Sequence, residues 1–190
     1  LDIGQTDYYP QLSRVLAHKP DMINIINNPI EEGLQIKQLR ELGWDGPIRG
    51  ICQQPQQMMD TAGGKDVVEG VYCINGIDFD QGPPFITPEM TRIRNAHLAE
   101  YGDDLELQPL MVYDGTLGVL EAIKMAGTID PEEVNKVFRN FNWKLSSGFM
   151  TSWGGKEALG NKGQLVQPVG VSQFQDGIIR VIGNVVISVP

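Results

Sequence analysis

The sequence lacks long apolar runs and a surplus of basic charge. No window approaches the roughly 18 uninterrupted apolar residues of a membrane span, so we expect no membrane-spanning helix. The 24 acidic side chains outnumber the 15 basic ones, which gives a net charge of −9. A protein that binds phosphate backbones needs the opposite balance, clustered on one face. The charge therefore argues against nucleic acid as a partner.

Metal-binding and nucleophilic side chains are scarce. The two histidines, His18 and His97, lie far apart, and the spacing of the two cysteines, Cys52 and Cys73, fits no zinc site. Whether these cysteines pair with each other is left open. No G-x-x-x-x-G-K-[ST] phosphate loop and no G-x-S-x-G nucleophile motif occurs. We therefore expect no metal, no cofactor and no catalytic constellation.

The first residue is Leu1, and no basic segment followed by an apolar one stands at the start. We therefore expect the chain to be a fragment or a processed product.

The first half of the chain alternates between helix and strand patterns. Helices are predicted over residues 7–18, 30–42 and 54–61, and strands over 22–26, 47–52 and 67–74. Strands that alternate with helices of about a dozen residues imply right-handed crossovers and a parallel sheet. This half is predicted to be α/β.

The second half carries strong helix-capping signals. Helices are predicted from Thr87-Pro88 to Gly102, from about Asp114 to Gly127, and from Asp130-Pro131 to about residue 141. The helical period ends at about residue 148. Residues 169–175 and 178–181, joined by Asp176-Gly177, predict a β-hairpin with a tight primed turn.

Polar residues follow two of the predicted parallel strands. Asn27 and Asn28 follow the first strand, and Cys52 and Gln53 follow the second. In open α/β sheets, ligands bind at the carboxyl ends of the strands, and amide side chains both donate and accept hydrogen bonds. These four residues are the candidate ligand-binding residues. The alternative is that both clusters are simply good turn formers.

Several motifs together resemble a known family. They are T-D-Y-Y-P-Q-L at 6–12, K-P-D-M-I at 19–23, Q-L-R-E-L-G at 38–43, Y-D at 113–114, A-G-T-I-D-P-E-E-V at 126–134 and Q-F-Q-D-G at 173–177. Their order and spacing resemble the second lobe of the branched-chain amino-acid-type solute-binding proteins. These are type I periplasmic binding proteins that serve ABC importers.

The resemblance implies two α/β lobes, of which this chain holds the C-terminal half. Residues 1–80 would form the second-lobe core, 84–146 the helices that return to the missing first lobe, and 148–190 the final strands of the second lobe. Without that first lobe, we expect an exposed apolar patch on the returning helices, formed by Met90, Ile93, Leu117, Leu120, Val137, Phe138 and Phe141.

The resemblance also implies a function without catalysis. A family member captures a small organic molecule by hinge closure and delivers it to an ABC permease. It carries a signal peptide and works in the periplasm or outside the cell, with a lipid anchor as one option. Two alternatives remain open: a ligand-sensing domain of a membrane receptor with the same fold, and an α/β enzyme that depends on Cys52.

The family's ligand contacts carry over only in part. An aromatic residue after the first strand and an acidic residue after the second contact the amino-acid ligand in the family. The corresponding positions here hold Asn28 and Cys52, with Gln53 beside it. A neutral wall leaves a ligand ammonium group uncompensated. The candidate ligands are therefore amino acids, carboxylates, amides and aromatic acids. We expect carboxylates, amides or aromatic acids to bind more tightly than leucine, isoleucine and valine.

Overall fold

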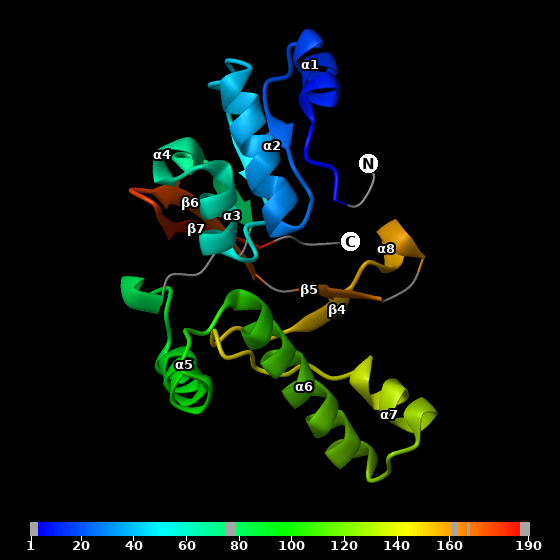
Figure 1. Cartoon of the computed structure of the whole chain (residues 1–190). Helices are drawn as coiled ribbons and strands as arrows, with labels where there is room; N and C mark the ends of the chain where they lie inside the picture. Colours follow the sequence, from blue (N-terminus) through cyan, green and yellow to red (C-terminus); the bar gives the residue numbers. More distant parts are fainter. Residues whose placement is uncertain (1–3, 75–78, 161–162, 167, 187–190) are drawn as a thin grey trace. The chain divides into compact units, whose positions relative to one another are not determined.

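The chain folds into two compact units (Figure 1). The computed structural model describes residues 4–74, 79–160, 163–166 and 168–186. The first unit comprises Leu1–Asp78 and Gly170–Gly183, and the second comprises Phe79–Val169 and Asn184–Pro190. None of the described helices is both long and apolar enough to cross a membrane.

The first unit is built on a five-stranded sheet in the order β1-β2-β3-β6-β7. Its strands are β1 (Ile23–Asn24), β2 (Ile48–Gly50), β3 (Tyr72–Ile74), β6 (Pro168–Gln175) and β7 (Ile178–Val186), and its helices are α1 (Tyr9–Ala17), α2 (Pro29–Glu41), α3 (Pro55–Ala62) and α4 (Lys65–Val68). Strands β1, β2 and β3 run parallel, and β6 pairs antiparallel with β3. This arrangement confirms the predicted α/β class.

The core of the first unit lies between this sheet and its helices. Ile36 and Leu39 of α2 are fully buried, as are Ile48 of β2 and Phe174 of β6. Helix α2 begins where it does because the Asn28 side chain accepts a hydrogen bond from the Glu31 amide, and Pro29 takes the first helical position. Ile36 and Leu39 of this helix lie in one buried cluster with Ile48 and Phe174 of the sheet.

Two details of the first unit differ from the sequence prediction. Val67 and Val68 belong to helix α4 rather than to a strand, because periodicity alone does not separate a buried helical turn from a buried strand. Helix α1 takes Tyr8 as its N-cap, and the Asp7 carboxylate accepts the Tyr9 amide instead.

The hairpin prediction is confirmed. Strands β6 and β7 are neighbours in the sheet and are joined at Asp176 and Gly177, which have φ of 56° and 81°. Positive φ at both central positions is the signature of the primed turn that suits the twist of paired strands. Figure 1 shows this orange-to-red hairpin next to α4, in keeping with the close approach of Gly177 to the Lys65 side chain.

The second unit is mainly helical. It contains the 3₁₀ turn η1 (Phe79–Gln81), helices α5 (Pro88–Tyr101), α6 (Leu107–Ala126), α7 (Pro131–Phe138) and α8 (Lys156–Leu159), and the antiparallel pair β4 (Ser152–Gly154) and β5 (Gln164–Val166). Thr87 caps α5 and Asp130 caps α7, as predicted. Helix α6 begins at Leu107, well before Asp114, and α8 is a short helix where none was predicted.

The expected apolar patch on the helices of the second unit is only partly present. Met90 and Ile93 are 3% and 7% exposed, so their predicted exposure is wrong. Leu110, Ala122 and Trp143 in the same unit are also buried, so part of its apolar surface is covered without the first lobe. Leu117 and Leu120 on α6 are exposed, whereas Val137, Phe138 and Phe141 are half-buried.

Candidate functional site

The carboxyl ends of the parallel strands define the candidate site in the first unit. Ile23 of β1 pairs with Ile48 of β2, and Gly50 of β2 pairs with Cys73 of β3, all in the same direction. Residues that follow β1 and β2 therefore leave the sheet at one edge, where ligands of open α/β sheets bind. The predicted clusters at 27–28 and 52–53 both leave the sheet there.

The asparagine cluster has a structural role that still leaves polar atoms available. The Asn27 side-chain oxygen accepts the Asn28 amide at 3.1 Å. The Asn28 side-chain oxygen accepts the Glu31 amide at 3.0 Å and so caps α2. Within the described residues, neither side-chain amide nitrogen donates a hydrogen bond. Asn28 is exposed and Asn27 half-buried. Both can therefore donate to a ligand without losing the helix cap.

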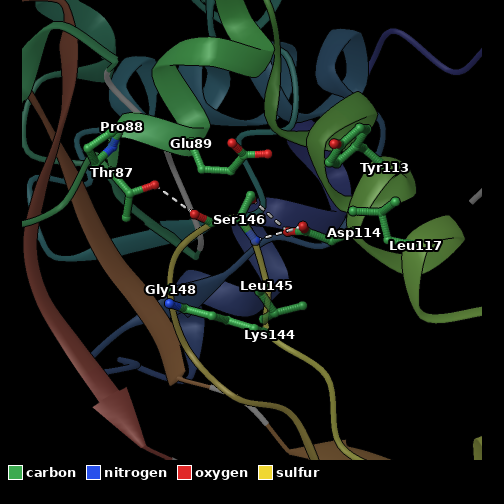
Figure 2. A pocket seen from close by; sticks show the side chains of 10 residues that line it. All are labelled: Thr87, Pro88, Glu89, Tyr113, Asp114, Leu117, Lys144, Leu145, Ser146 and Gly148. Carbon is green, nitrogen blue, oxygen red and sulfur yellow. Dashed lines mark hydrogen bonds between the residues drawn. The ribbon is translucent and has the colours of Figure 1, made fainter. Parts of the chain in front are cut away.

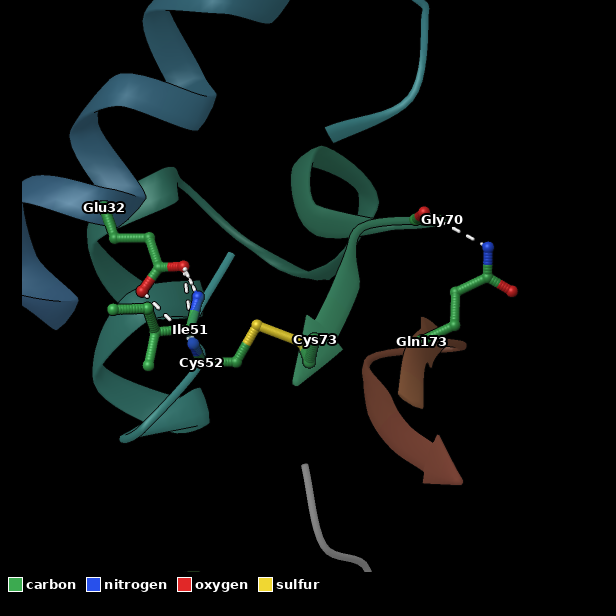
Figure 3. Close-up of a disulfide and its surroundings, with 6 residues drawn as sticks. All are labelled: Glu32, Ile51, Cys52, Gly70, Cys73 and Gln173. Carbon is green, nitrogen blue, oxygen red and sulfur yellow. Dashed lines mark hydrogen bonds between the residues drawn. A yellow bond between two sulfur atoms is a disulfide. The ribbon is translucent and has the colours of Figure 1, made fainter. Parts of the chain in front are cut away.

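Cys52 is not a free thiol. Its sulfur forms a disulfide with Cys73, with the two Cα atoms 5.6 Å apart, and both residues are 1% exposed (Figure 3). The interpretation of Cys52 as an enzyme nucleophile is therefore wrong, because the sulfur is already bonded. The adjacent Gln53 is half-buried, and in the described part of the chain its side chain makes no hydrogen bond.

Glu32 is a buried carboxylate behind this turn. Its side chain is 0% exposed. One oxygen accepts the Ile51 amide at 2.7 Å, and the Cys52 amide lies 3.3 and 3.4 Å from the two carboxylate oxygens (Figure 3). Burial raises the pKa of Glu32 from 4.5 to about 7, against the opposing effects of the two amides and of Arg49.

Gly50 is required for this arrangement. A Cβ atom at position 50 would lie 1.9 Å from the Glu32 Oε1 atom, closer than any real contact. The glycine thus lets the carboxylate approach the backbone of β2. Sequence reasoning missed Glu32, although its spacing from Ile36 and Leu39 (i, i+4, i+7) already placed it on the buried face of α2.

A cavity of about 600 Å³ lies within the second unit (Figure 2). Its lining includes Glu89, Tyr113, Asp114, Lys144 and Ser146. The Asp114 carboxylate accepts both the amide and the hydroxyl of Ser146, each at 2.8 Å. The acceptor oxygens of Asp114 therefore already hold a neighbouring segment, and this part of the cavity lining has a structural role.

The same joint involves the cap of α5. The Thr87 hydroxyl donates to the Ser146 carbonyl at 2.6 Å (Figure 2) and also accepts the Met90 amide. Burial raises the pKa of Asp114, and the two hydrogen bonds from Ser146 oppose that effect. These contacts fix the segment around Ser146 to α5 and α6.

Neither unit offers a metal centre in its described residues. No group of three or more His, Cys, Asp or Glu side chains is placed to hold a metal ion there. The chemistry of the candidate site is hydrogen bonding by neutral amides next to a disulfide.

Residues 1–177 match the sequence profile of a family described as periplasmic binding protein. The chain belongs to this family. No curated protein sequence matches this periplasmic binding protein. The resemblance carried by the sequence motifs is confirmed.

Solved structures share the fold of this periplasmic binding protein. The leucine-binding protein LivK of Thermotoga maritima is 22% identical, with a TM-score of 0.76 over 97% of this chain and 50% of its own. LivJ of Streptococcus pneumoniae, solved with isoleucine, is 19% identical (TM-score 0.71, 98% and 50% covered). A solute-binding protein of R. palustris solved with benzoate is 13% identical (TM-score 0.70, 99% and 50% covered). The chain thus spans about half the length of these structures.

Proposed function

We propose that the chain is the C-terminal half of an extracytoplasmic solute-binding protein of an ABC importer. The observation that carries the proposal is membership of the periplasmic binding protein family together with polar residues at the carboxyl edge of its parallel sheet. The Cys52–Cys73 disulfide supports the location, because disulfides persist in oxidising compartments such as the periplasm.

The mechanism we propose is capture between two lobes followed by hinge closure, without covalent chemistry. Residues 1–80 and 148–190 belong to the second lobe in this proposal, and residues 84–146 belong with a first lobe encoded upstream. The chain covers about half of solved relatives, in keeping with such a division. The ligand selects the closed state through its contacts with both lobes, and an ABC permease receives it.

The second-lobe wall of the site would present Asn27, Asn28 and Gln53 to the ligand, with the buried, disulfide-bonded Cys52 holding Gln53 from behind. None of these four residues carries a charged side chain, and the Glu32 carboxylate behind the turn is fully buried and accepts backbone amides. Amide donors suit carboxylates, amides and aromatic acids. Relatives solved with isoleucine and with benzoate show that one fold accommodates both kinds of molecule.

A ligand screen on the protein with its upstream half tests this proposal. We expect benzoate and similar carboxylic acids to raise the melting temperature, and leucine, isoleucine and valine to raise it less. Strong stabilisation by the branched-chain amino acids would show that the site is misplaced. Calorimetry should give a much weaker affinity for the 190-residue chain alone, because a two-lobe trap needs both walls.

Matched variants locate the wall. Gln53→Ala removes a candidate donor, whereas Gln57→Ala removes an exposed glutamine one turn along α3. Asn28→Ser keeps a side-chain oxygen for the α2 cap but removes the amide donor. We expect Gln53→Ala and Asn28→Ser to weaken binding about tenfold each, the effect of one lost hydrogen bond, and Gln57→Ala to leave it unchanged.

A further inference from the structure

The turn that follows β2 is held from two sides. On one side the Glu32 carboxylate accepts the amides of Ile51 and Cys52. On the other side the Cys52 side chain is bonded covalently to Cys73, the middle residue of the neighbouring strand β3. Cys52 itself has a φ of 55°, a conformation that L-residues adopt only when their surroundings impose it. The position of Gln53 follows from these two attachments.

The two attachments differ in chemistry. The disulfide does not titrate, whereas the carboxylate can gain a proton. A charged Glu32 matches the turn, since both of its oxygens are acceptors facing backbone donors. A protonated Glu32 carries a hydrogen on one oxygen and loses acceptor capacity toward those donors. Only one of the two attachments can therefore change with pH.

The surroundings of Glu32 contain little compensating charge. Among the described residues Glu32 forms no salt bridge. The charged group whose field favours its ionised form is Arg49 on strand β2. Glu31 precedes it on α2 and accepts the Gly4 amide. The remaining charged groups on the helices packed against α2 are exposed, and they are Arg14 on α1, Asp60 on α3, and Lys65 and Asp66 on α4.

We propose that Glu32 is the positioning residue of the Ile51–Gln53 turn, and that uptake of a proton by Glu32 releases this turn and moves Gln53. The turn is part of a ligand wall only if the proposed function holds. The proton-linked movement does not depend on that function. Burial of the carboxylate puts the transition near neutral pH, because the pKa of Glu32 is raised to about 7.

A pH titration of the isotope-labelled full chain tests this inference by NMR. We expect the backbone amide resonances of Ile51 and Cys52 to shift together between pH 5 and 9, with a midpoint near the pKa of about 7. The side-chain amide resonances of Gln53 should shift with the same midpoint, and those of Gln57 should not. The chemical shift of the Glu32 carboxyl carbon reports protonation of this side chain directly, so this measurement requires no substitution.

Glu32→Gln should abolish the shared transition while the Cys52–Cys73 disulfide remains. The matched control is Glu31→Gln, which removes the adjacent, similarly buried carboxylate whose partner is the Gly4 amide rather than the turn. That control should leave the transition of Ile51 and Cys52 in place.

Constant resonances at Ile51 and Cys52 across this pH range would overturn the inference, as would a transition that survives Glu32→Gln. If Glu32→Gln fails to fold, the titration of the Glu32 carboxyl carbon in the unmodified chain still decides. If the shared transition of Ile51, Cys52 and Gln53 is observed but the protein binds no small molecule, the proposed function is wrong and this inference still holds.

Discussion

The positions of Glu32 and Gly50 depend on each other. The carboxylate reaches the backbone of β2 only because position 50 has no side chain. The backbone amides beyond Gly50 in turn give the buried charge its hydrogen-bond donors. A buried polar group without partners costs about 1–3 kcal/mol. The buried carboxylate is therefore stable only while both backbone amides donate to it.

At the residue scale, we predict that Glu32 makes stability fall as the pH rises. Its folded-state pKa of about 7 lies above the ordinary 4.5, so over this interval the folded chain holds a proton that the unfolded chain has released. Its contribution is fully present below pH 4.5 and is lost as the pH rises through 7. The size is roughly 3 kcal/mol.

Urea denaturation at several pH values measures this contribution. The free energy of unfolding of Glu32→Gln should change less between pH 5 and 8 than that of the unmodified chain. Glu31→Gln is the control and should retain the full pH dependence. Identical pH profiles for Glu32→Gln and the unmodified chain would contradict the prediction.

At the element scale, the disulfide ties together two short parallel strands. Strands β2 and β3 each have three residues, and their register links only Arg49 with Tyr72 and Gly50 with Cys73. Such a short ladder contributes few hydrogen bonds. The covalent bond between the turn after β2 and the middle of β3 therefore supplies a large part of their attachment.

We predict that removal of this bond destabilises the first unit. The cysteines are 21 positions apart, and closing a loop of this length is worth about 3 kcal/mol in the chain-entropy account. The double variant Cys52→Ser/Cys73→Ser should lose about that much free energy of unfolding. Dithiothreitol should destabilise the unmodified chain to a similar extent and leave the double variant unaffected, so a response of the double variant would point to another cause.

Sequence patterns predicted most elements but not the contacts of the site. The parallel sheet, the caps at Thr87 and Asp130 and the primed turn at Asp176-Gly177 follow from local rules, and each is present. The disulfide and the Glu32 attachment join segments about 20 residues apart. No local rule ranks such pairs, because their formation depends on strand register and on the room left at Gly50.

At the scale of the whole molecule, the second unit exposes apolar side chains on α6. Val112, Leu120 and Met125 are 64%, 54% and 60% exposed, whereas Leu110, Gly118 and Ala122 on the same helix are buried. A helix that is apolar on more than its buried face usually packs against a further partner. In our proposal that partner is the first lobe.

We predict that the chain alone self-associates through α6 and that the upstream half prevents this. Light scattering should show oligomers for the 190-residue chain and a single complex once the upstream half is present. Val112→Ser/Leu120→Ser should reduce self-association at little cost in stability, since both residues are exposed.

The control for this prediction is Ile129→Ser, which removes an 84% exposed side chain outside α6. It should leave self-association unchanged. A stable monomer of the unmodified chain would argue against a missing partner for α6.

The pairing of β3 with β6 has a consequence for how the first unit folds. Tyr72 pairs with Gln173, and the Gln173 side chain donates to the Gly70 carbonyl across 103 positions of sequence. Contacts of such high sequence separation slow folding, because the intervening chain must be closed into a loop first. During synthesis, one edge of β3 therefore stays unpaired until β6 has been made. An unpaired strand edge can pair with another chain, so we expect the nascent protein to be prone to aggregation during this interval.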